Sequence, residues 1–304
     1  MKLNITSGRK LRPVKCVIYG SEGIGKSTLA AQLPDPLFID TEDGTGQLDV
    51  KRVDPPNDWQ ELLDTVDAIK DASPAVCKTL VIDTVDHAEQ LCINYVCKKY
   101  NQSSIESFGY GKGYTYVADT FDNLLVHLDG VISKGMNVVL IAHAKMRKFE
   151  QPDELGAYDR WEMKLSKNTL PYVKEWCDML LFANYKTFVV NTQNGKAKAK
   201  GAERKIYTTH NACWDAKNRF GLPEELPMSV QPLLEIFGAT STTPQEQLQQ
   251  MMQRDNISEE TVTRCAIARG KQAPDIPLSQ YDDKLITQWI IPNWQNIINY
   301  GGNR

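Results

Sequence analysis

The sequence predicts an α/β fold, with a core domain built on a mainly parallel, twisted sheet and a small helical domain after it. The core is indicated by short β-branched runs that alternate with segments of helical spacing as far as Gly238, a pattern typical of βαβ units. The break is indicated by the small, polar composition of residues 238–244, which marks a linker. We therefore predict a core domain over residues 1–238 and a helical C-terminal appendage over residues 239–304.

Five apolar runs are the predicted strands of the parallel part of the sheet. They are Val14–Tyr19, Leu37–Asp40, Thr79–Asp83, Asn137–Ala142 and Asp178–Ala183. Between the third and fourth runs, one helix is expected to begin at Thr84, and apolar residues within Tyr114–Ile132 keep the spacing of another. After the fifth run, Phe188–Thr192 and Lys205–Thr209 are expected to form antiparallel strands joined by a long glycine- and lysine-rich loop.

The C-terminal residues read as three short helices. They are Gln245–Arg254, Ser258–Arg269 and Asp282–Asn299. Thr243 and Ser258 are suitable N-caps for the first two, because a hydroxyl can accept a hydrogen bond from an N–H group of the first turn. The segment has too few residues for a large core of its own.

The composition is that of a globular chain with a sizeable core. Of 304 residues, 41% are hydrophobic and 24% are charged, which excludes disorder of the whole chain. No apolar run approaches the roughly 20 residues of a membrane span, and Met1–Pro13 lacks the apolar region of a signal peptide. Seven scattered cysteines without a Cys-x-x-Cys pair indicate reduced thiols in the cytoplasm. The net charge of −3 argues against a bulk polycation that coats nucleic acid, but not against a local basic groove.

A phosphate-binding loop follows the first predicted strand. Its pattern is a glycine, four residues and then Gly-Lys-Ser, between an apolar strand and a helix-forming segment. Small residues let backbone N–H groups wrap phosphates at a helix N-terminus, while Lys26 reaches the β- and γ-phosphates and Ser27 binds Mg²⁺. The residues of this predicted P-loop are Gly20, Ser21, Glu22, Gly23, Ile24, Gly25, Lys26, Ser27 and Thr28.

Two further strands end in carboxylates that suit phosphoryl transfer. Asp83 ends a buried strand and is predicted as the second ligand of Mg²⁺, with a helix-capping role as the alternative. Glu42 follows the strand that we expect beside the P-loop strand, and it is predicted to hold the attacking water. Asp40 and Asp43 are the alternatives to Glu42, the first as a structural residue and the second as an exposed one.

These residues stand in an order that resembles RecA-type ATPases. Phe38–Glu42 is similar to the Glu-bearing strand end of those proteins, and Val138–His143 is similar to their sensor strand. The polar residue that ends this strand under the γ-phosphate is Gln in RecA and His143 here, and a surface or helix-capping histidine is the alternative. Lys217 and Arg219 resemble the Lys-x-Arg finger of hexameric replicative helicases and the paired lysines of RecA. The resemblance implies that they neutralise charge across a subunit interface, with a solvated basic loop as the alternative.

Other branches of the P-loop proteins fit less well. The chain has no Asn-Lys-x-Asp motif for guanine and no separate Arg-bearing lid helices of a small-molecule kinase. More narrowly, it resembles the RecA-like class of phage single-strand annealing proteins over about residues 14–225. The segments that carry this resemblance are Tyr19–Ser27, Val81–Thr84, Ser107–Tyr114, Ile141–His143 and Ala216–Pro223. It implies ATP and Mg²⁺ as cofactors, single-stranded DNA as a partner, and a homo-oligomer, ring or filament, with active sites at subunit interfaces.

One candidate for contact with DNA combines aromatic residues with a cation. Tyr110, Lys112 and Tyr114 stand on a glycine-rich segment, which suits base stacking and phosphate contact with a single strand. A hinge into the following helix, or a contact between subunits, explains the same residues equally well.

Two further candidates are basic. One directly follows the predicted sensor strand. The resemblance to RecA implies that this segment is a loop that couples DNA binding to the ATP state. Acidic residues in the same segment would repel a phosphate backbone. The basic residues of the segment are Lys145, Arg147 and Lys148. The other is a one-sided basic run in the predicted hairpin loop, for which a mobile solvated turn is the alternative. The run comprises Lys196, Lys198, Lys200, Arg204 and Lys205, and the first three are the predicted DNA contacts.

Together these features predict an ATP- and Mg²⁺-dependent RecA-like ATPase of a phage or prophage, in the cytoplasm of a bacterial host. It is expected to bind single-stranded DNA and to promote annealing or recombination. The alternatives are a ring-shaped DNA helicase or translocase and an ATP-switched scaffold that loads partner proteins with little turnover. A single-strand-binding protein is a conceivable partner of the C-terminal helices, for which no specific feature is present.

Overall fold

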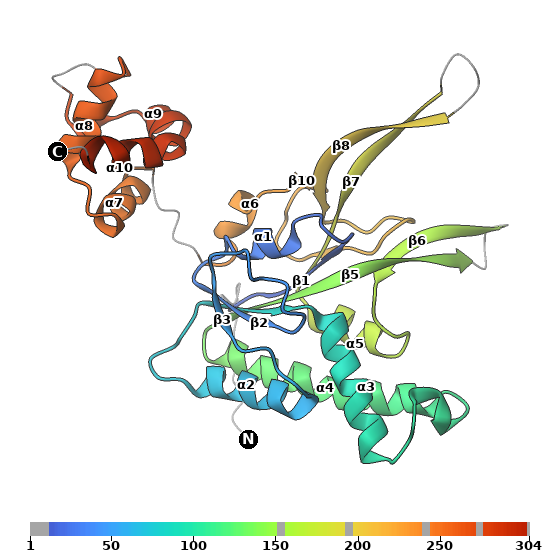
Figure 1. The fold of residues 1–304 in the computed structure, drawn as a ribbon. Helices are drawn as coiled ribbons and strands as arrows, with labels where there is room; N and C mark the ends of the chain where they lie inside the picture. Colours follow the sequence, from blue (N-terminus) through green and yellow to red (C-terminus); the bar gives the residue numbers. More distant parts are fainter. Residues whose placement is uncertain (1–11, 151–155, 192–196, 239–243, 272–275, 303–304) are drawn as a thin grey trace, which may run out of the picture. The chain divides into compact units, whose positions relative to one another are not determined.

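The structure is a computed structural model (Figure 1). The residues that it describes are 12–150, 156–191, 197–238, 244–271 and 276–302. The chain falls into two compact units, Met1–Gly238 and Ala239–Arg304, and each is described by itself.

The first unit is organised around one sheet. Within the described residues this sheet has ten strands in the order β10-β8-β7-β1-β5-β4-β2-β3, with β6 beside β5 and β9 beside β7. The strands are β1 (Lys15–Gly20), β2 (Pro36–Asp40), β3 (Lys51–Val53), β4 (Thr79–Asp83), β5 (Asn137–Glu150), β6 (Ala157–Met163), β7 (Met179–Asn191), β8 (Ala197–Tyr207), β9 (Lys217–Asn218) and β10 (Glu225–Pro227). The strands from β7 to β3 run parallel, whereas β6, β8, β9 and β10 are antiparallel to their neighbours. The predicted α/β fold with a mainly parallel sheet is therefore confirmed.

Helices cover both faces of this sheet (Figure 1). They are α1 (Lys26–Ala30), α2 (Trp59–Asp71), α3 (Val85–Lys99), α4 (Lys112–Ser133), α5 (Thr169–Trp176) and α6 (Gln231–Leu234), with a short 3₁₀ helix, η1 (Ile105–Phe108). On one face, α2 to α5 bury a large apolar core that contains Trp59, Phe121 and Phe182. On the other face, α1 and α6 contribute Leu29 and Leu233 to a second core. The sheet between these two cores is the rigid support of the site.

The carboxyl ends of the parallel strands meet at one edge of the sheet, where ligands of such sheets bind. β1 ends at Gly20, β2 at Asp40 and β4 at Asp83, while His143 lies level with Gly20 on β5. One predicted neighbour relation is wrong: the strand that leads to Glu42 is not beside the P-loop strand, because β5 and β4 lie between β1 and β2. Crossover connections through helices allow such non-consecutive neighbours. The sensor strand therefore separates the P-loop strand from the Asp83 strand.

Two antiparallel hairpins extend beyond the parallel part of the sheet (Figure 1). In the β5–β6 arm, β5 continues past His143 and pairs with β6. In the β7–β8 arm, β7 pairs with β8 along most of its length. Both basic segments were predicted as loops, which is wrong, because residues 145–148 lie in β5 and residues 197–200 lie in β8. The outer half of β5 alternates between half-buried and exposed residues, so it lacks the apolar pattern by which a strand is recognised.

The second unit contains the predicted C-terminal helices. Its elements are α7 (Pro244–Arg254), α8 (Glu259–Ala268), η2 (Leu278–Gln280), α9 (Asp283–Leu285), η3 (Ile286–Ile290), η4 (Ile291–Asn293) and α10 (Trp294–Gly302). Ser258 caps α8 as predicted and accepts a hydrogen bond from the N–H of Thr261, whereas Thr243 lies outside the described residues. The single helix expected over residues 282–299 is divided, because Pro292 has no N–H to continue the ladder. None of the helices in the described part of the chain is long and apolar enough to cross a membrane.

Candidate functional site: a phosphate-binding cavity at the carboxyl edge of the sheet

The predicted P-loop joins β1 to α1. Gly20 has no room for a side chain, since a Cβ atom there would lie 2.1 Å from the carbonyl oxygen of Ala183 on β7. Gly23 and Gly25 have φ angles of 69° and 104°, which cost glycine little and other residues much more. The first glycine therefore permits a close approach of two strands, and the other two shape the turn.

Lys26 folds back over this loop. Its Nζ donates hydrogen bonds to the carbonyl oxygens of Gly20 at 3.1 Å and Ser21 at 3.0 Å, and the residue is only 6% exposed. Burial lowers the pKa of Lys26, and nearby carboxylates, Asp83 first, oppose that effect. A buried ammonium group whose partners are neutral carbonyls gains a much stronger partner when an anionic phosphate enters the loop.

Asp83 lies opposite Ser27 at the same edge. The Ser27 hydroxyl donates a hydrogen bond to the Asp83 carboxyl, which belongs to a residue that is 6% exposed. Burial raises the pKa of Asp83 to about 6; the charge of Asp40 adds to this effect, and Ser27 and Lys26 oppose it. A hydroxyl and a carboxylate in contact are oxygen ligands of the kind that Mg²⁺ prefers. Ser27 and Asp83 therefore fit the predicted metal site.

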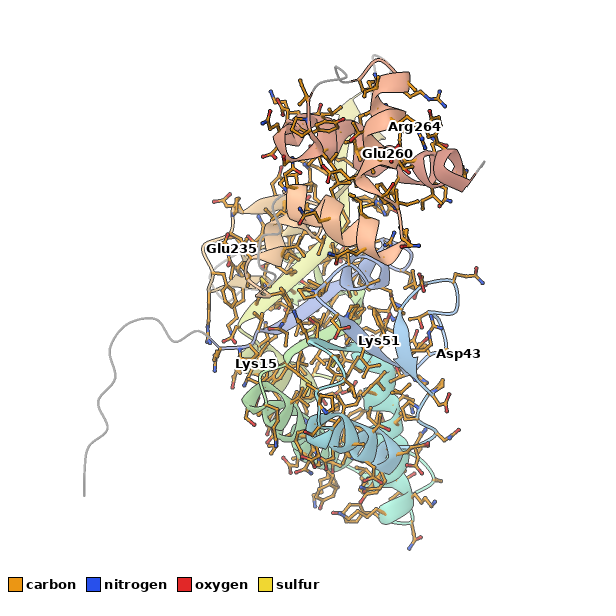
Figure 2. All side chains as sticks on the ribbon, turned by 90° about the vertical axis from the view of Figure 1, so that its left-hand side faces the viewer. Lys15, Asp43, Lys51, Glu235, Glu260 and Arg264 are labelled. Carbon is orange, nitrogen blue, oxygen red and sulfur yellow. The ribbon has the colours of Figure 1, made fainter. Side chains whose placement is uncertain are left out.

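The loop that carries Glu42 is fixed by Asp40. The Asp40 carboxylate accepts hydrogen bonds from the N–H groups of Glu42 at 3.3 Å, Gly44 at 3.1 Å and Thr45 at 2.7 Å, and from the Thr45 hydroxyl at 2.6 Å. Burial raises the pKa of Asp40, but these hydrogen bonds outweigh it and hold the pKa below its usual value. Asp40 thus has the structural role given as its alternative, and Asp43 is exposed on the same loop (Figure 2).

Glu42 and His143 lie close together in the cavity. Each is held by one residue at the beginning of α3: Glu42 by the N-cap, Thr84, and His143 by Asp86 in the first turn. The Thr84 hydroxyl donates to Oε1 of Glu42 at 2.5 Å, and Nδ1 of His143 lies 3.9 Å from the same oxygen. Asp86 accepts hydrogen bonds from Nδ1 and from the backbone N–H of His143, both at 2.9 Å. The hydrogen bond that His143 donates to Asp86 is the main cause that raises the pKa of His143, against the effect of burial. The imidazolium form is therefore favoured beside the P-loop.

One cavity of about 260 Å³ contains most of these groups. It is lined by Gly23, Gly25, Lys26, Ser27, Thr28, Asp40, Glu42, Gly44, Asp83, Thr84 and His143. The structure therefore brings together the P-loop, both predicted carboxylates and the predicted sensor residue, although they come from four separate strands.

The predicted finger residues lie at the other edge of the sheet, where β9 pairs with the beginning of β7. Nζ of Lys217 donates to the carbonyl oxygens of Lys174 at 3.0 Å and Cys177 at 2.6 Å, at the end of α5. Nη1 of Arg219 lies 2.9 Å from Oδ1 of Asp178. The structure gives both cations partners in their own chain and does not bring them to the cavity. Their action on another subunit stays a prediction.

The predicted glycine-rich DNA segment is more ordered than expected. Only Gly109–Gly111 lies between η1 and α4, so Lys112 and Tyr114 already belong to the helix. The Tyr114 hydroxyl donates to Oε1 of Glu106 at 2.7 Å. Tyr110 is fully exposed at the turn. Of the two predicted aromatic contacts, Tyr110 is free to meet a ligand, whereas Tyr114 also tethers the helix.

The basic residues of the β5–β6 arm differ in their surroundings. Lys145 donates to a backbone carbonyl oxygen, and Nη1 of Arg147 lies 3.4 Å from Oε2 of Glu162. Lys148 is exposed. On the β7–β8 arm, the backbones of Lys198 and Lys200 belong to β8, and Lys196 lies outside the described residues.

Three residues near the cavity were not predicted as part of the nucleotide site. Thr84 and Asp86 follow Asp83 so closely that a helix beginning there must present its first turn to the same edge, which is a usable sequence signal. Arg204 on β8 donates from Nη1 to the carbonyl oxygen of Ile24 at 3.3 Å. No sequence signal predicts that contact, because the two residues are far apart in the chain.

Fold and site together define a RecA-like P-loop protein of the nucleotide-binding class. The chain belongs to the AAA domain family AAA_24, whose model matches residues 12–220. It is also similar to the SPbeta prophage-derived uncharacterized protein YorG of Bacillus subtilis (strain 168), with 26% identity over 132 residues. The matched part is 42% of this chain and 40% of YorG, so the chain spans less than half the length of that relative.

Two solved structures from archaea overlap with most of the chain at low identity. The KaiC-like protein PH0186 of Pyrococcus horikoshii OT3 is 12% identical and covers 71% of this chain and 85% of its own, with a TM-score of 0.41. The flagellar accessory protein FlaH of Methanocaldococcus jannaschii is 10% identical and covers 72% of this chain and 88% of its own, with a TM-score of 0.38. These TM-scores are too low to support an argument. The assignment of the chain to the RecA-like P-loop proteins therefore depends on the strand order, the site and the family match.

Proposed function

We propose that this protein hydrolyses ATP with Mg²⁺ and couples hydrolysis to the binding of single-stranded DNA, in the annealing or recombination of phage DNA. The observation that carries the proposal is the single cavity in which the P-loop faces the carboxylates of Asp83 and Glu42. The similarity to a prophage-derived protein supports the phage setting.

Phosphate binding is assigned to the P-loop and Lys26. The loop presents backbone N–H groups at the beginning of α1, which suit the oxygens of a nucleoside triphosphate. Lys26 would exchange its two carbonyl partners for phosphate oxygens. Ser27 and Asp83 would hold Mg²⁺, which neutralises phosphate charge when bound.

Positioning of the attacking water is assigned to Glu42. Thr84 holds one carboxylate oxygen, Oε1, and Asp40 fixes the backbone of the loop, so the direction of the carboxylate is set before a ligand enters. The other oxygen, Oε2, can accept a hydrogen bond from water. Phosphoryl transfer depends mainly on such positioning, which supports Glu42 over its neighbour Asp43, a residue that does not line the cavity.

Response to the nucleotide is assigned to His143. Asp86 holds Nδ1, which leaves Nε2 to donate a hydrogen bond towards the γ-phosphate. Because β5 continues without interruption from His143 into the β5–β6 arm, a shift of this residue would move the strand that carries Lys145 and Lys148. Such a connection between the nucleotide and a basic arm supports coupling to DNA.

The proposal is tested by measuring ATP hydrolysis with and without a single-stranded oligonucleotide. We expect DNA to raise the rate, and Lys26→Ala to abolish nucleotide binding and hydrolysis. The matched control is Lys134→Ala, which removes an exposed lysine at the C-terminal end of α4. A rate that does not respond to DNA would contradict the coupling, and full activity of Lys26→Ala would contradict the assignment of the P-loop.

A further inference from the structure

A second cavity, of about 650 Å³, shares no lining residue with the nucleotide cavity. It is lined by Trp161, Asn184, Tyr185, Lys186, Tyr207, Cys213, Trp214 and Glu225. These residues come from both arms, from the segment between β8 and β10, and from the first residue of β10. Its volume is in the range of ligand-binding pockets.

Four of the eight residues that line this cavity are aromatic, and three of these rings pack against the core. The ring centroids of Tyr207 and Trp214 are 4.4 Å apart, and both rings stack on the buried Phe182 at 6.0 Å and 5.7 Å. Trp161 lies against the same phenylalanine at 6.2 Å. Trp161, Tyr207 and Trp214 are only half-buried, so part of each ring is open to the cavity. A set of rigid, half-exposed rings loses little entropy when a flat ligand stacks on it.

The rim of the cavity adds further contact area and mixed charge. Tyr185 is 42% exposed, and Met146, which pairs with Trp161 across the β5–β6 arm, is 54% exposed. Nζ of Lys186 lies 2.8 Å from both carboxylate oxygens of Glu225. The cavity itself is therefore suited to a planar, largely uncharged group, while exposed cations such as Lys148 lie farther out on the arm.

The P-loop and the residue before it are hydrogen-bonded to residues in or next to the wall of this cavity. The Ser21 hydroxyl donates to Oδ1 of Asn184 at 3.3 Å. The Tyr19 hydroxyl donates to the carbonyl oxygen of Asp215 at 2.6 Å and accepts from its N–H at 3.1 Å, directly after Trp214. Ser21 of the P-loop is thus bonded to a residue that lines the aromatic cavity, and Tyr19, directly before the loop, is bonded to the residue that follows Trp214.

We propose that this aromatic cavity is a base-stacking site for single-stranded DNA, so that bases lie between the two arms and the backbone follows the cations on them. The inference rests on the proposed function, which it deepens by giving the DNA a site. Stacking on aromatic faces is the sequence-tolerant mode by which single strands are held. The adenine of ATP is the other flat group to consider. It is disfavoured because the aromatic walls belong to the sheet face covered by α2 to α5, whereas the P-loop leads into α1 on the opposite face.

The test measures binding of fluorescein-labelled oligothymidylate by anisotropy over a series of salt concentrations. The variants are Tyr185→Ala, Trp214→Leu and the conservative Trp214→Phe. Tyr172→Ala is the control, because Tyr172 on α5 is 39% exposed and outside the cavity. Affinity for a fluorescent ATP analogue is measured on the same proteins, and urea unfolding shows whether each variant is folded.

We expect Tyr185→Ala and Trp214→Leu to weaken oligonucleotide binding by roughly 5- to 100-fold, with Trp214→Phe and Tyr172→Ala close to the unsubstituted protein. The slope of affinity against salt should not change, because no cation is removed. If the unsubstituted protein binds DNA and Tyr185→Ala binds equally well, the stacking site is wrong while the proposed function stands. Loss of ATP-analogue binding with intact DNA binding would identify an adenine site instead and overturn the inference. If the unsubstituted protein binds no oligonucleotide, the proposed function itself fails, and the stacking site with it.

Discussion

Replacing Asp83 with asparagine should make the ligand-free protein more stable at neutral pH. The Asp83 carboxyl is buried at the sheet edge, and its pKa rises from 3.8 to about 6 in the folded chain. A carboxyl whose pKa is raised by folding favours the folded state while it is neutral, and this contribution is lost as the pH rises from about 4 to about 6. At about 1.4 kcal/mol per pKa unit, the cost of ionising Asp83 in the folded protein is about 3 kcal/mol.

Asp83→Asn cannot ionise, so it avoids this cost. We expect the free energy of unfolding in urea to be about 2–3 kcal/mol higher than that of the unsubstituted protein at pH 7.5, and nearly equal to it at pH 4. With Mg²⁺ and ATP the order should reverse, since only the unsubstituted protein keeps the metal ligand and gains stability from binding. Asp43→Asn is the control, because Asp43 is exposed and does not line the cavity.

Two results would refute this reasoning. An Asp83→Asn variant that is less stable at pH 7.5 would mean that its carboxylate contributes favourable contacts beyond Ser27 and Lys26. A stability difference that is the same at pH 4 and pH 7.5 would mean that ionisation is not its cause.

Three further predictions concern His143, Gly20 and Arg219. Because Asp86 raises the pKa of His143 above its usual 6.5, the stability that this pair contributes should be complete below pH 6.5 and lost as the pH rises through the raised value. Urea unfolding across pH 5–9 checks this, and an Asp86→Asn protein with an unchanged pH dependence would contradict it. Gly20→Ala should destabilise the core by about 1–3 kcal/mol or prevent folding, since its Cβ would lie 2.1 Å from the carbonyl oxygen of Ala183; thermal unfolding measures the loss, and an unchanged Tm would show that the strands can separate freely. If Arg219 acts on a neighbouring subunit, a mixture of Arg219→Ala and Glu42→Gln proteins should recover ATPase activity that neither has alone, whereas no recovery would restrict Arg219 to its ion pair within the chain.

Continuous motifs of the candidate site could be predicted from the sequence. The P-loop is recognised from an apolar strand followed directly by a glycine-containing turn, and Asp83 from its place at the end of an apolar strand. Both patterns depend only on residues that are adjacent in the sequence. The helix N-caps Thr84 and Ser258 were predictable for the same reason. Glu42 could be placed at a strand end, but not its partner Thr84, since that contact joins residues from two loops.

What could not be predicted depends on long-range pairing. The order of the strands in the sheet depends on how the connecting helices cross over its two faces. No local sequence pattern indicates that β5 and β4 lie between β1 and β2. The outer halves of both arms carry polar residues, so the lysine-rich segments resemble loops although their backbones are paired. The aromatic cavity is a further case, because Trp161 and Trp214 become neighbours only through an isolated bridge between distant segments.

The most direct test of the proposed ATPase compares the unsubstituted protein with Glu42→Gln. Both are given Mg²⁺, ATP and a single-stranded oligonucleotide, and nucleotide affinity is measured beside the hydrolysis rate. Because the proposed role of Glu42 is to hold the water and not the phosphates, we expect nearly unchanged ATP affinity and hydrolysis that is slower by about 100-fold or more. Glu42→Gln protein that hydrolyses ATP at the full rate would contradict the account, as would unsubstituted protein that binds ATP but never hydrolyses it.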